Sequence, residues 1–257
     1  MTSGRLEGAV CIVTGGLSGL GAATTRALLA EGAQVAVLAR NVTRSRAEAE
    51  WDRAEPLLVE VDVRHHEQVE NGFDKVVGEL GVPNAVVHCA GIATLGRIND
   101  HKAERAHTQL RDSIDTNIVG TFNVARQAAI AMPDDSTDGR ARTIVLTSSI
   151  AAFDGQAGQV TYAATKGAIA SMTLPLAREL AGLGIRVVTI APGVFGTPML
   201  DGLPVAARDA LAAATPFPSR VGEPDEFASL VVHALDNAML NGETIRLDGA
   251  LRIPAGP

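Results

Sequence analysis

The chain has 257 residues, of which 46% are hydrophobic, 20% are charged and only 3% are aromatic. This composition excludes a disordered chain, a collagen-like repeat and a coiled coil. The formal net charge of −7 argues against nucleic acid as a partner, and no apolar run is long enough to span a membrane. The two cysteines, Cys11 and Cys89, form neither a disulfide framework nor a metal-ligand cluster, so we expect a reducing, cytoplasmic location and no bound metal.

Short apolar runs rich in β-branched residues alternate along the chain with longer amphipathic stretches. This alternation is typical of a parallel sheet covered by helices on both faces, and we predict a single doubly wound α/β domain over residues 1–257, with three α/β/α layers. The predicted strands are 9–14, 34–39, 57–61, 85–89, 143–147, 185–190 and 243–247. The predicted helices are 19–31, 68–80, 104–132, 160–183 and 206–214.

The stretch between residues 192 and 224 is irregular and holds six of the twelve prolines. It follows the end of a predicted strand and contains a short alanine-rich helix. Such a long loop beside a strand end suits a lid over a substrate, which we place near residues 194–220. A surface insertion without a role is the alternative.

The first predicted strand runs directly into a glycine-rich turn, Thr14-Gly-Gly-Leu-Ser-Gly-Leu-Gly21, and the first helix follows. Glycines allow a tight turn and a close approach to a ligand, and the N-terminus of a helix offers free N–H groups to a pyrophosphate. A purely structural turn is the alternative, but the position between first strand and first helix favours a dinucleotide. The predicted contacts are Gly15, Leu17, Ser18, Gly19, Leu20 and Gly21.

The end of the second predicted strand indicates which dinucleotide binds. An acidic residue there would accept hydrogen bonds from the ribose hydroxyls, whereas this chain has Ala39 followed by Arg40, with Arg44 and Arg46 nearby. A guanidinium favours a 2′-phosphate, so we predict NADP in preference to NAD. A solvated surface cation is the alternative for Arg40. Asp62, with Val63 beside it, is placed to meet the adenine, although Asp62 could equally be a turn or capping residue.

Tyr162 and Lys166 lie four residues apart in a predicted helix and therefore share one face. A phenol is too weak an acid for efficient proton transfer at neutral pH, and a nearby ammonium lowers its pKa. An exposed Tyr–Lys pair is the alternative. However, Ser149 follows the preceding strand at the carboxyl edge of the sheet, where its hydroxyl could hold a reacting oxygen beside the phenol. Ser148 is the neighbour most easily confused with it.

These features together resemble the short-chain dehydrogenase/reductase family: the turn ending at Gly21, the run Cys89-Ala90-Gly91, Asn117, and the Ser149, Tyr162 and Lys166 set. The resemblance covers essentially the whole chain. It implies a Rossmann-type seven-stranded sheet, a homotetramer and chemistry on a nicotinamide dinucleotide. The implied cofactor contacts near the nicotinamide are Cys89, Ala90, Gly91, Tyr162, Lys166, Pro192, Gly193 and Thr197.

The same resemblance implies the catalytic roles. Tyr162 is the expected general acid and base, while Lys166 lowers the pKa of the phenol and binds the nicotinamide ribose. Ser149 orients the substrate oxygen, and Asn117 supports a water-linked proton relay. We also expect Gln156 and Gln159 to contact the substrate, against a structural role in their loop. The expected apolar lining comprises Phe153, Val194, Phe195, Met199 and Leu200.

Several segments resemble the members of that family that oxidise 3-hydroxyacyl-CoA esters and some hydroxysteroids with NAD: 151–159, 172–178, 195–200, 216–220 and 241–250. The chain departs from them at Ala39, where they carry an acidic residue. We predict an NAD(P)-dependent enzyme that interconverts a secondary alcohol, such as a 3-hydroxyacyl-CoA or a hydroxysteroid, and a ketone. The alternatives are an NADPH-dependent reductase of an unrelated ketone and a non-catalytic dinucleotide-binding protein.

Overall fold

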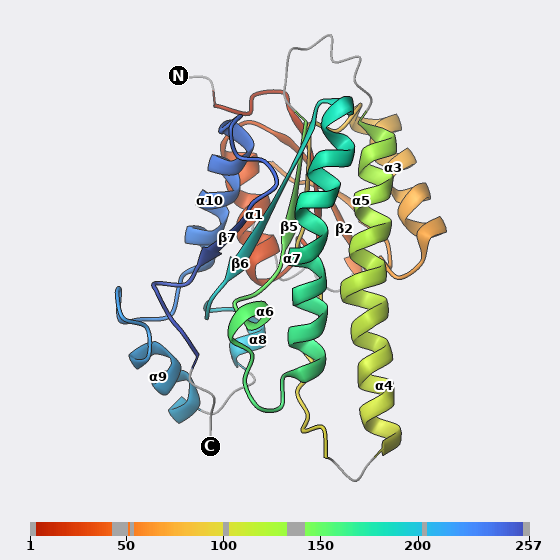
Figure 1. The fold of residues 1–257 in the computed structure, drawn as a ribbon. Coiled ribbons are helices and arrows are strands. Elements are labelled where there is room, and N and C mark those ends of the chain that lie inside the picture. Colours follow the sequence, from red (N-terminus) through yellow and green to blue (C-terminus); the bar gives the residue numbers. More distant parts are fainter. Residues whose placement is uncertain are drawn as a thin grey trace.

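A computed structural model of the chain describes residues 4–42, 51, 54–99, 103–132, 142–201 and 205–253. Seven parallel strands form one sheet between two layers of helices (Figure 1). The strands are β1 (Val10–Thr14), β2 (Gln34–Ala39), β3 (Leu57–Glu60), β4 (Ala85–His88), β5 (Arg142–Thr147), β6 (Ile185–Pro192) and β7 (Thr244–Leu247). Their order is β3-β2-β1-β4-β5-β6-β7, so the direction of winding reverses between β1 and β4. Ligands bind at such a reversal, outside the carboxyl ends of the strands.

Two layers of helices cover the sheet. Helices α1 (Gly19–Ala30) and α10 (Pro224–Asp236) pack on one face, and α3 (His66–Leu80), α5 (Gly120–Ala131) and α7 (Val160–Leu180) pack on the other (Figure 1). The shorter elements are α4 (Ala103–Ser113), η1 (Ile114–Val119), α6 (Ala151–Asp154), η2 (Ala181–Leu183), α8 (Pro198–Asp201) and α9 (Val205–Ala213). No helix in the described part of the chain is long and apolar enough to cross a bilayer.

Burial on both faces explains why the strands are apolar throughout. Successive side chains of a strand point to opposite faces, so Ile12 of β1 joins one apolar cluster and Val13 joins the other. All residues of β1, β5 and β6 are buried. The predicted α/β class, the single sheet and its seven strands are therefore confirmed, with strand ends that differ by three residues or fewer.

The structure corrects two predictions about helices. The helix expected over 104–132 is interrupted, because residues Ile114–Val119 form a π-helical segment between α4 and α5. Helix α10 was not predicted, although the sequence carries its start signal. Pro224 occupies the first turn, and Glu226 accepts the backbone N–H of Glu223 in a capping box. The predicted strand at 243–247, β7, runs beside β6 and brings the C-terminal residues to the edge where the site forms.

Candidate active site

A cavity of about 1140 Å³ opens at the carboxyl edge of the sheet. Residues that follow β1, β2, β3, β4, β5 and β6 all contribute to its wall. The residues that the sequence predicts to contact cofactor or substrate line this cavity, apart from Phe153 of the expected apolar lining; the predicted catalytic residue Asn117 does not line it either. Arg44 and Arg46 lie outside the described residues.

The glycine-rich turn forms one end of the cavity. Gly15 and Gly19 have φ angles of +66° and +52°, which L side chains rarely adopt. A Cβ on Gly21 would lie 2.2 Å from the carbonyl oxygen of Gly15, so the helix can approach the turn only with glycine there. Ser18 is the N-cap of α1, yet its side chain makes no capping hydrogen bond, and the first turn has no acidic residue. The free N–H groups of this helix start fit a pyrophosphate.

Arg40 and Asp62, the residues predicted to meet the adenosine part of a dinucleotide, both line the cavity. Asp62 is also a turn residue, because its carboxylate accepts hydrogen bonds from the backbone N–H of Arg64 at 3.1 Å and from the Arg64 side chain. The hydrogen bond from Arg64 lowers the pKa of Asp62. The negative charge of Asp62 is therefore offset by a neighbour, while Arg40 is exposed at the cavity wall.

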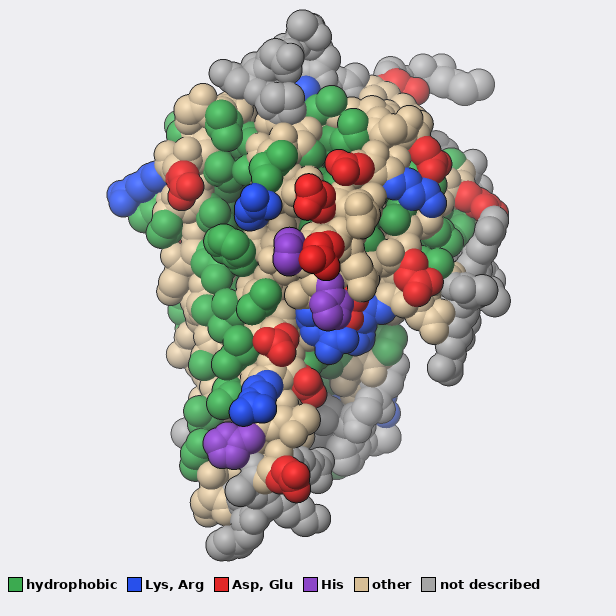
Figure 2. Space-filling view, turned by 90° about the vertical axis from the view of Figure 1, so that its right-hand side faces the viewer, with side chains coloured by type: hydrophobic (Ala, Val, Ile, Leu, Met, Phe, Trp, Pro, Cys, Tyr) green, Lys and Arg blue, Asp and Glu red, His purple; other side chains and the backbone are tan. Residues whose placement is uncertain are grey.

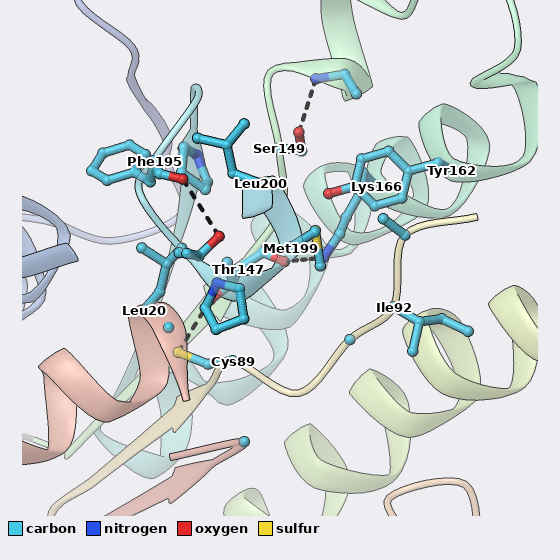
Figure 3. Close-up of a pocket in the computed structure, with 18 of the residues that line it drawn as sticks. Leu20, Cys89, Ile92, Thr147, Ser149, Tyr162, Lys166, Phe195, Met199 and Leu200 are labelled. Carbon is cyan, nitrogen blue, oxygen red and sulfur yellow. Dashed lines mark hydrogen bonds between the residues drawn. The ribbon is translucent and has the colours of Figure 1, made fainter. Parts of the chain in front are cut away.

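The two serines after β5 have different roles. The hydroxyl of Ser148 donates to the backbone carbonyl of Lys166 at 2.7 Å, which anchors α7 to the strand. Ser149 lines the cavity, and its oxygen accepts the backbone N–H of Ala151 at 3.1 Å (Figure 3). Interaction with the Ser149 side chain lowers the pKa of Tyr162, and both side chains line the cavity. The structure therefore selects Ser149 as the partner of the phenol.

Tyr162 and Lys166 lie one turn apart on α7, with the ammonium of Lys166 5.9 Å from the centre of the Tyr162 ring. The Lys166 ammonium is buried and donates to the carbonyl oxygen of Thr147 at 2.9 Å (Figure 3). Burial lowers the pKa of Lys166 to about 8. Burial also raises the pKa of Tyr162, and the hydrogen bond with Ser149 only partly opposes this. Lys166 is not among the causes of this shift, so the expected lowering of the phenol pKa by Lys166 stays a prediction.

Cys89 occupies the cavity wall next to this pair. Its sulfur accepts a hydrogen bond from the Thr147 hydroxyl at 3.7 Å. Burial raises the pKa of the thiol to about 11, so it stays protonated at neutral pH. A protonated thiol is a weak nucleophile, which leaves Cys89 as a lining residue for the cofactor.

Asn117 is fully buried in the π-helical segment and lies behind the cavity wall. Its side chain accepts the N–H of Ile92 and donates to the Ile92 carbonyl, both at 2.9 Å, and it also donates to the Thr165 hydroxyl at 3.0 Å. It thereby ties the loop after β4 to α7, one residue before Lys166. These contacts make Asn117 a positioning residue, while its expected role in a proton relay stays a prediction.

The sequence and the fold of this chain are similar to those of several known proteins. A family model described as short chain dehydrogenase matches residues 9–206. The human protein named 3-hydroxyacyl-CoA dehydrogenase type-2 is 42% identical over 252 residues, which cover 96% of this chain and 97% of that protein. The Drosophila melanogaster protein of the same name is 44% identical over 253 residues, or 96% and 99% of the two chains. A crystal structure of 3-hydroxyacyl-CoA dehydrogenase type-2 from Mycobacterium avium matches with a TM-score of 0.86 and 35% identity, over 98% and 99% of the chains. The chain belongs to the short-chain dehydrogenase family.

The protein is accordingly an NAD(P)-dependent oxidoreductase that acts on CH–OH groups. The turn, the helix start and the lining of the cavity all fit a bound dinucleotide. Gly15, Gly19 and Gly21 would hold the pyrophosphate, and Pro192, Gly193 and Thr197 lie where they can meet the nicotinamide end. Gly91 keeps the approach open there, because a Cβ on it would lie 3.5 Å from the Lys166 ammonium and 3.2 Å from the Asn117 side chain.

The substrate end of this dehydrogenase is mostly apolar. Gln156 and Gln159 line it, and the amide oxygen of Gln159 accepts the backbone N–H of Gln156 at 3.0 Å. Phe153 does not line the cavity as expected, because its ring packs against the Arg246 guanidinium instead. The expected apolar residues that do line it are Val194, Phe195, Met199 and Leu200.

Four further apolar residues of this wall were not predicted: Ile92, Leu95, Leu211 and Ile253. They come from three separate segments, after β4, in α9 and near the C-terminus. No local motif marks them. Their position depends on how the loops fold over the sheet edge.

We predict that Gly21→Ala weakens dinucleotide binding by at least about tenfold, since the added methyl group displaces the turn from the helix start. Titration of cofactor fluorescence measures this. Gly78→Ala is the control, because a Cβ on Gly78 in α3 meets nothing within 4 Å. That substitution should leave binding unchanged and stabilise the fold by up to about 1 kcal/mol. Equal dissociation constants for both variants would contradict the assignment of the turn.

Proposed function

We propose that this dehydrogenase interconverts 3-hydroxyacyl-CoA and 3-oxoacyl-CoA esters. The observation that supports the proposal most strongly is that Ser149 and Tyr162 line one cavity together with the glycine-rich turn and the apolar residues Val194, Phe195, Met199 and Leu200. The relatives named 3-hydroxyacyl-CoA dehydrogenase type-2 support the same substrate class. Hydroxysteroids, which are also apolar and uncharged, are the second substrate class that this cavity suits.

The charges of the lining favour a thioester over a free acid. Among the described residues, only Arg40, Asp62 and Lys166 of the lining carry a formal charge. Arg40 and Asp62 are at the adenosine end, and the Lys166 ammonium donates to Thr147. A free 3-hydroxy acid would bury its carboxylate near the reacting carbon without a dedicated cation, which is costly. A thioester carries no such charge.

The side chains account for the proton transfer. In the oxidative direction, Tyr162 must first lose its own proton; the phenolate oxygen then takes the proton of the substrate hydroxyl, and Ser149 holds that hydroxyl by a hydrogen bond. The bound dinucleotide supplies the acceptor for the hydride that leaves the alcohol carbon. In the reductive direction, the protonated phenol donates to the developing alkoxide. The Lys166 ammonium, held by Thr147, supplies positive charge beside the phenol, and this stabilises whichever oxygen becomes negative.

We assign NADP(H) as the preferred dinucleotide. β2 ends at Ala39, which offers no carboxylate to a ribose, and Arg40 follows at the cavity wall. Arg64 offsets the charge of Asp62, so the adenosine end favours a 2′-phosphate.

We further propose that the segment near residues 194–220 covers the bound substrate. Val194, Phe195, Met199, Leu200 and Leu211 of this segment face the cavity. Limited proteolysis tests this, because saturating substrate should protect the segment from cleavage. A cleavage rate that substrate does not change would refute the proposed cover.

We also propose a homotetramer in the cytoplasm. Hydrophobic side chains form a column on the side that carries α4 and α5 (Figure 2), and Leu110, Val119, Phe122 and Ile130 are exposed there. A face of this kind suits a two-fold contact between copies. Light scattering measures the mass of the protein in solution. A mass near 26.6 kDa, which is that of one chain, would exclude the homotetramer. Cys11 and Cys89 form no disulfide, which suits a reducing compartment, and cell fractionation tests the location.

The substrate class is tested with matched pairs of 3-hydroxyacyl-CoA esters and the corresponding free acids. We expect kcat/KM to be higher for the thioesters by about 100-fold or more, because only the free acid buries an unpaired carboxylate. Tyr162→Phe should bind the dinucleotide normally and lose about 100-fold to 10,000-fold in rate. Free acids that react as fast as thioesters would exclude the proposed substrate, and full activity of Tyr162→Phe would exclude the proposed acid and base.

The rate of 3-oxoacyl-CoA reduction should be constant near neutral pH and fall above about pH 8. Reduction needs the protonated phenol and the charged ammonium, and rising pH removes both protons. The pKa of Lys166 is about 8, and burial raises the pKa of Tyr162. Initial rates over the alkaline range measure this limb. A reduction rate that increases steadily with pH would contradict these roles.

Arg40→Ala should weaken NADPH binding by about tenfold to 100-fold while NADH binding changes little, because a charge-assisted hydrogen bond to the 2′-phosphate is lost. Cofactor titrations with both dinucleotides provide the comparison. Arg26→Ala removes an exposed cation that does not line the cavity and serves as control. The assignment of NADP(H) rests on the charge of Arg40. It would be contradicted if the unmodified protein bound NADH tenfold more tightly than NADPH.

A further inference from the structure

Arg246 of β7 contacts two segments. One is helix α6, whose Asp154 lies 92 residues before Arg246 in the chain, and the other is the turn that follows β7. The Arg246 guanidinium donates to the carboxylate of Asp154 at the end of α6, and its Nε donates to Asp248 at 2.7 Å. It also donates to the backbone carbonyl of Leu251 at 3.0 Å. The ring of Phe153 packs against the same guanidinium, with its centre 5.4 Å from Cζ. We call this set, Arg246 with Asp154, Asp248 and the Leu251 carbonyl, the Arg246 clamp.

One arm of the clamp holds the segment that carries the catalytic serine. Ser149 accepts the N–H of Ala151 at the start of α6, and Asp154 ends that helix. Gln156 and Gln159 follow at the cavity wall, and Tyr162 lies in the next helix. Since α6 has a single turn, it has little stability of its own. A contact at Asp154 therefore restrains the whole stretch from Ser149 to Gln159.

The other arm holds the C-terminal turn. Asp248 accepts the Arg246 Nε and the N–H of Ala250, which has a φ angle of +65°. Ala250 is the one non-glycine residue in the described ranges with a positive φ, a conformation that costs energy without support. The turn directs the chain back, so that Leu251 is fully buried and Ile253 lines the cavity.

The clamp is partly shielded from water. The side chains of Arg246, Asp154 and Asp248 are only 22%, 20% and 7% exposed. Its hydrogen bonds lower the pKa of Asp154 and raise that of Arg246, which shows that both groups stay charged at neutral pH. A planar guanidinium can bind two carboxylates and a carbonyl at once, which a lysine ammonium does with less defined geometry.

We propose that Arg246 is a positioning residue for substrate: it fixes the Ser149–Gln159 stretch and the Ile253 wall relative to each other and thereby sets the width of the substrate end of the cavity. The proposal rests on the proposed function for its effect on acyl substrates. The glycine-rich turn and Arg40 lie on other segments, so the clamp acts mainly on substrate affinity. Its nearest approach to the nicotinamide end is at Gly193, where an added Cβ would lie 2.9 Å from Asp248.

The test compares Arg246→Met, which removes the Arg246 contacts of both arms and leaves the Arg252 side chain donating to Asp248 and the Leu251 carbonyl, with Asp154→Asn, which weakens only the arm to α6. Arg246→Met should raise the KM for a medium-chain acyl-CoA on the order of tenfold, with kcat altered less than about threefold and the dinucleotide Kd within about twofold. Hydrogen exchange gives a readout that does not need turnover. Amides at 149–159 and 250–253 should exchange faster in Arg246→Met, and those at 149–159 alone in Asp154→Asn.

Arg5→Met is the matched control, because it removes an exposed ion pair with Glu31 that does not line the cavity. The clamp is refuted if Arg246→Met leaves exchange at 149–159 and the KM unchanged, or if it accelerates exchange throughout the protein as a general loss of stability would. If Arg246→Met does not fold, Asp154→Asn decides by the same two measurements. An unmodified protein without activity on any acyl-CoA would refute the proposed function, whereas the exchange data would still test the clamp.

Discussion

The active site depends on one buried charge. The Lys166 ammonium lies inside the protein and donates to the Thr147 carbonyl at the end of β5, which fixes α7 against the carboxyl edge of the sheet. A buried ammonium without such an acceptor would be strongly destabilising. The Ser148 hydroxyl adds a second link between the same strand end and the Lys166 carbonyl. With the helix fixed in this way, Tyr162 one turn earlier can only face the cavity beside Ser149.

The π-helical segment also helps to hold α7 in place, from the side of the cavity wall that faces away from the cavity. Its wider turn sets the Asn117 side chain between the loop after β4 and α7, where it uses its amide on Ile92 and Thr165. Insertions of this kind are often found at functional sites, because they displace one side chain without breaking the helix. Here the displaced side chain fixes the distance between Gly91 and Lys166. The part of the cavity wall that carries Tyr162 and Lys166 is therefore fixed by contacts with the end of β5 and with the π-helical segment.

The cavity combines two different environments. At one end, Arg40 and Asp62 provide charge at the cavity wall, and Arg64 pairs with Asp62. At the other end, apolar side chains from the loop after β4, from α9 and from the C-terminal turn surround the reacting groups. Burial in that environment lowers the pKa of Lys166 and raises that of Tyr162, so the neutral phenol is the resting form. The same exclusion of water strengthens every hydrogen bond made to a reacting oxygen.

The sequence alone determined the α/β class, the seven strands and the residues of the turn and of the Ser149, Tyr162 and Lys166 set, because local signals encode them: apolar runs, glycines at a strand end, and a four-residue spacing on a helix. The tertiary structure alone decided the rest. It separated Ser148 from Ser149, turned Phe153 away from the cavity toward Arg246, placed Asn117 behind the wall, and brought Ile253 into the cavity lining. It also set the direction of the Tyr162 pKa. Each of these outcomes depends on burial and on contacts between segments far apart in the chain, which no local pattern of residues contains.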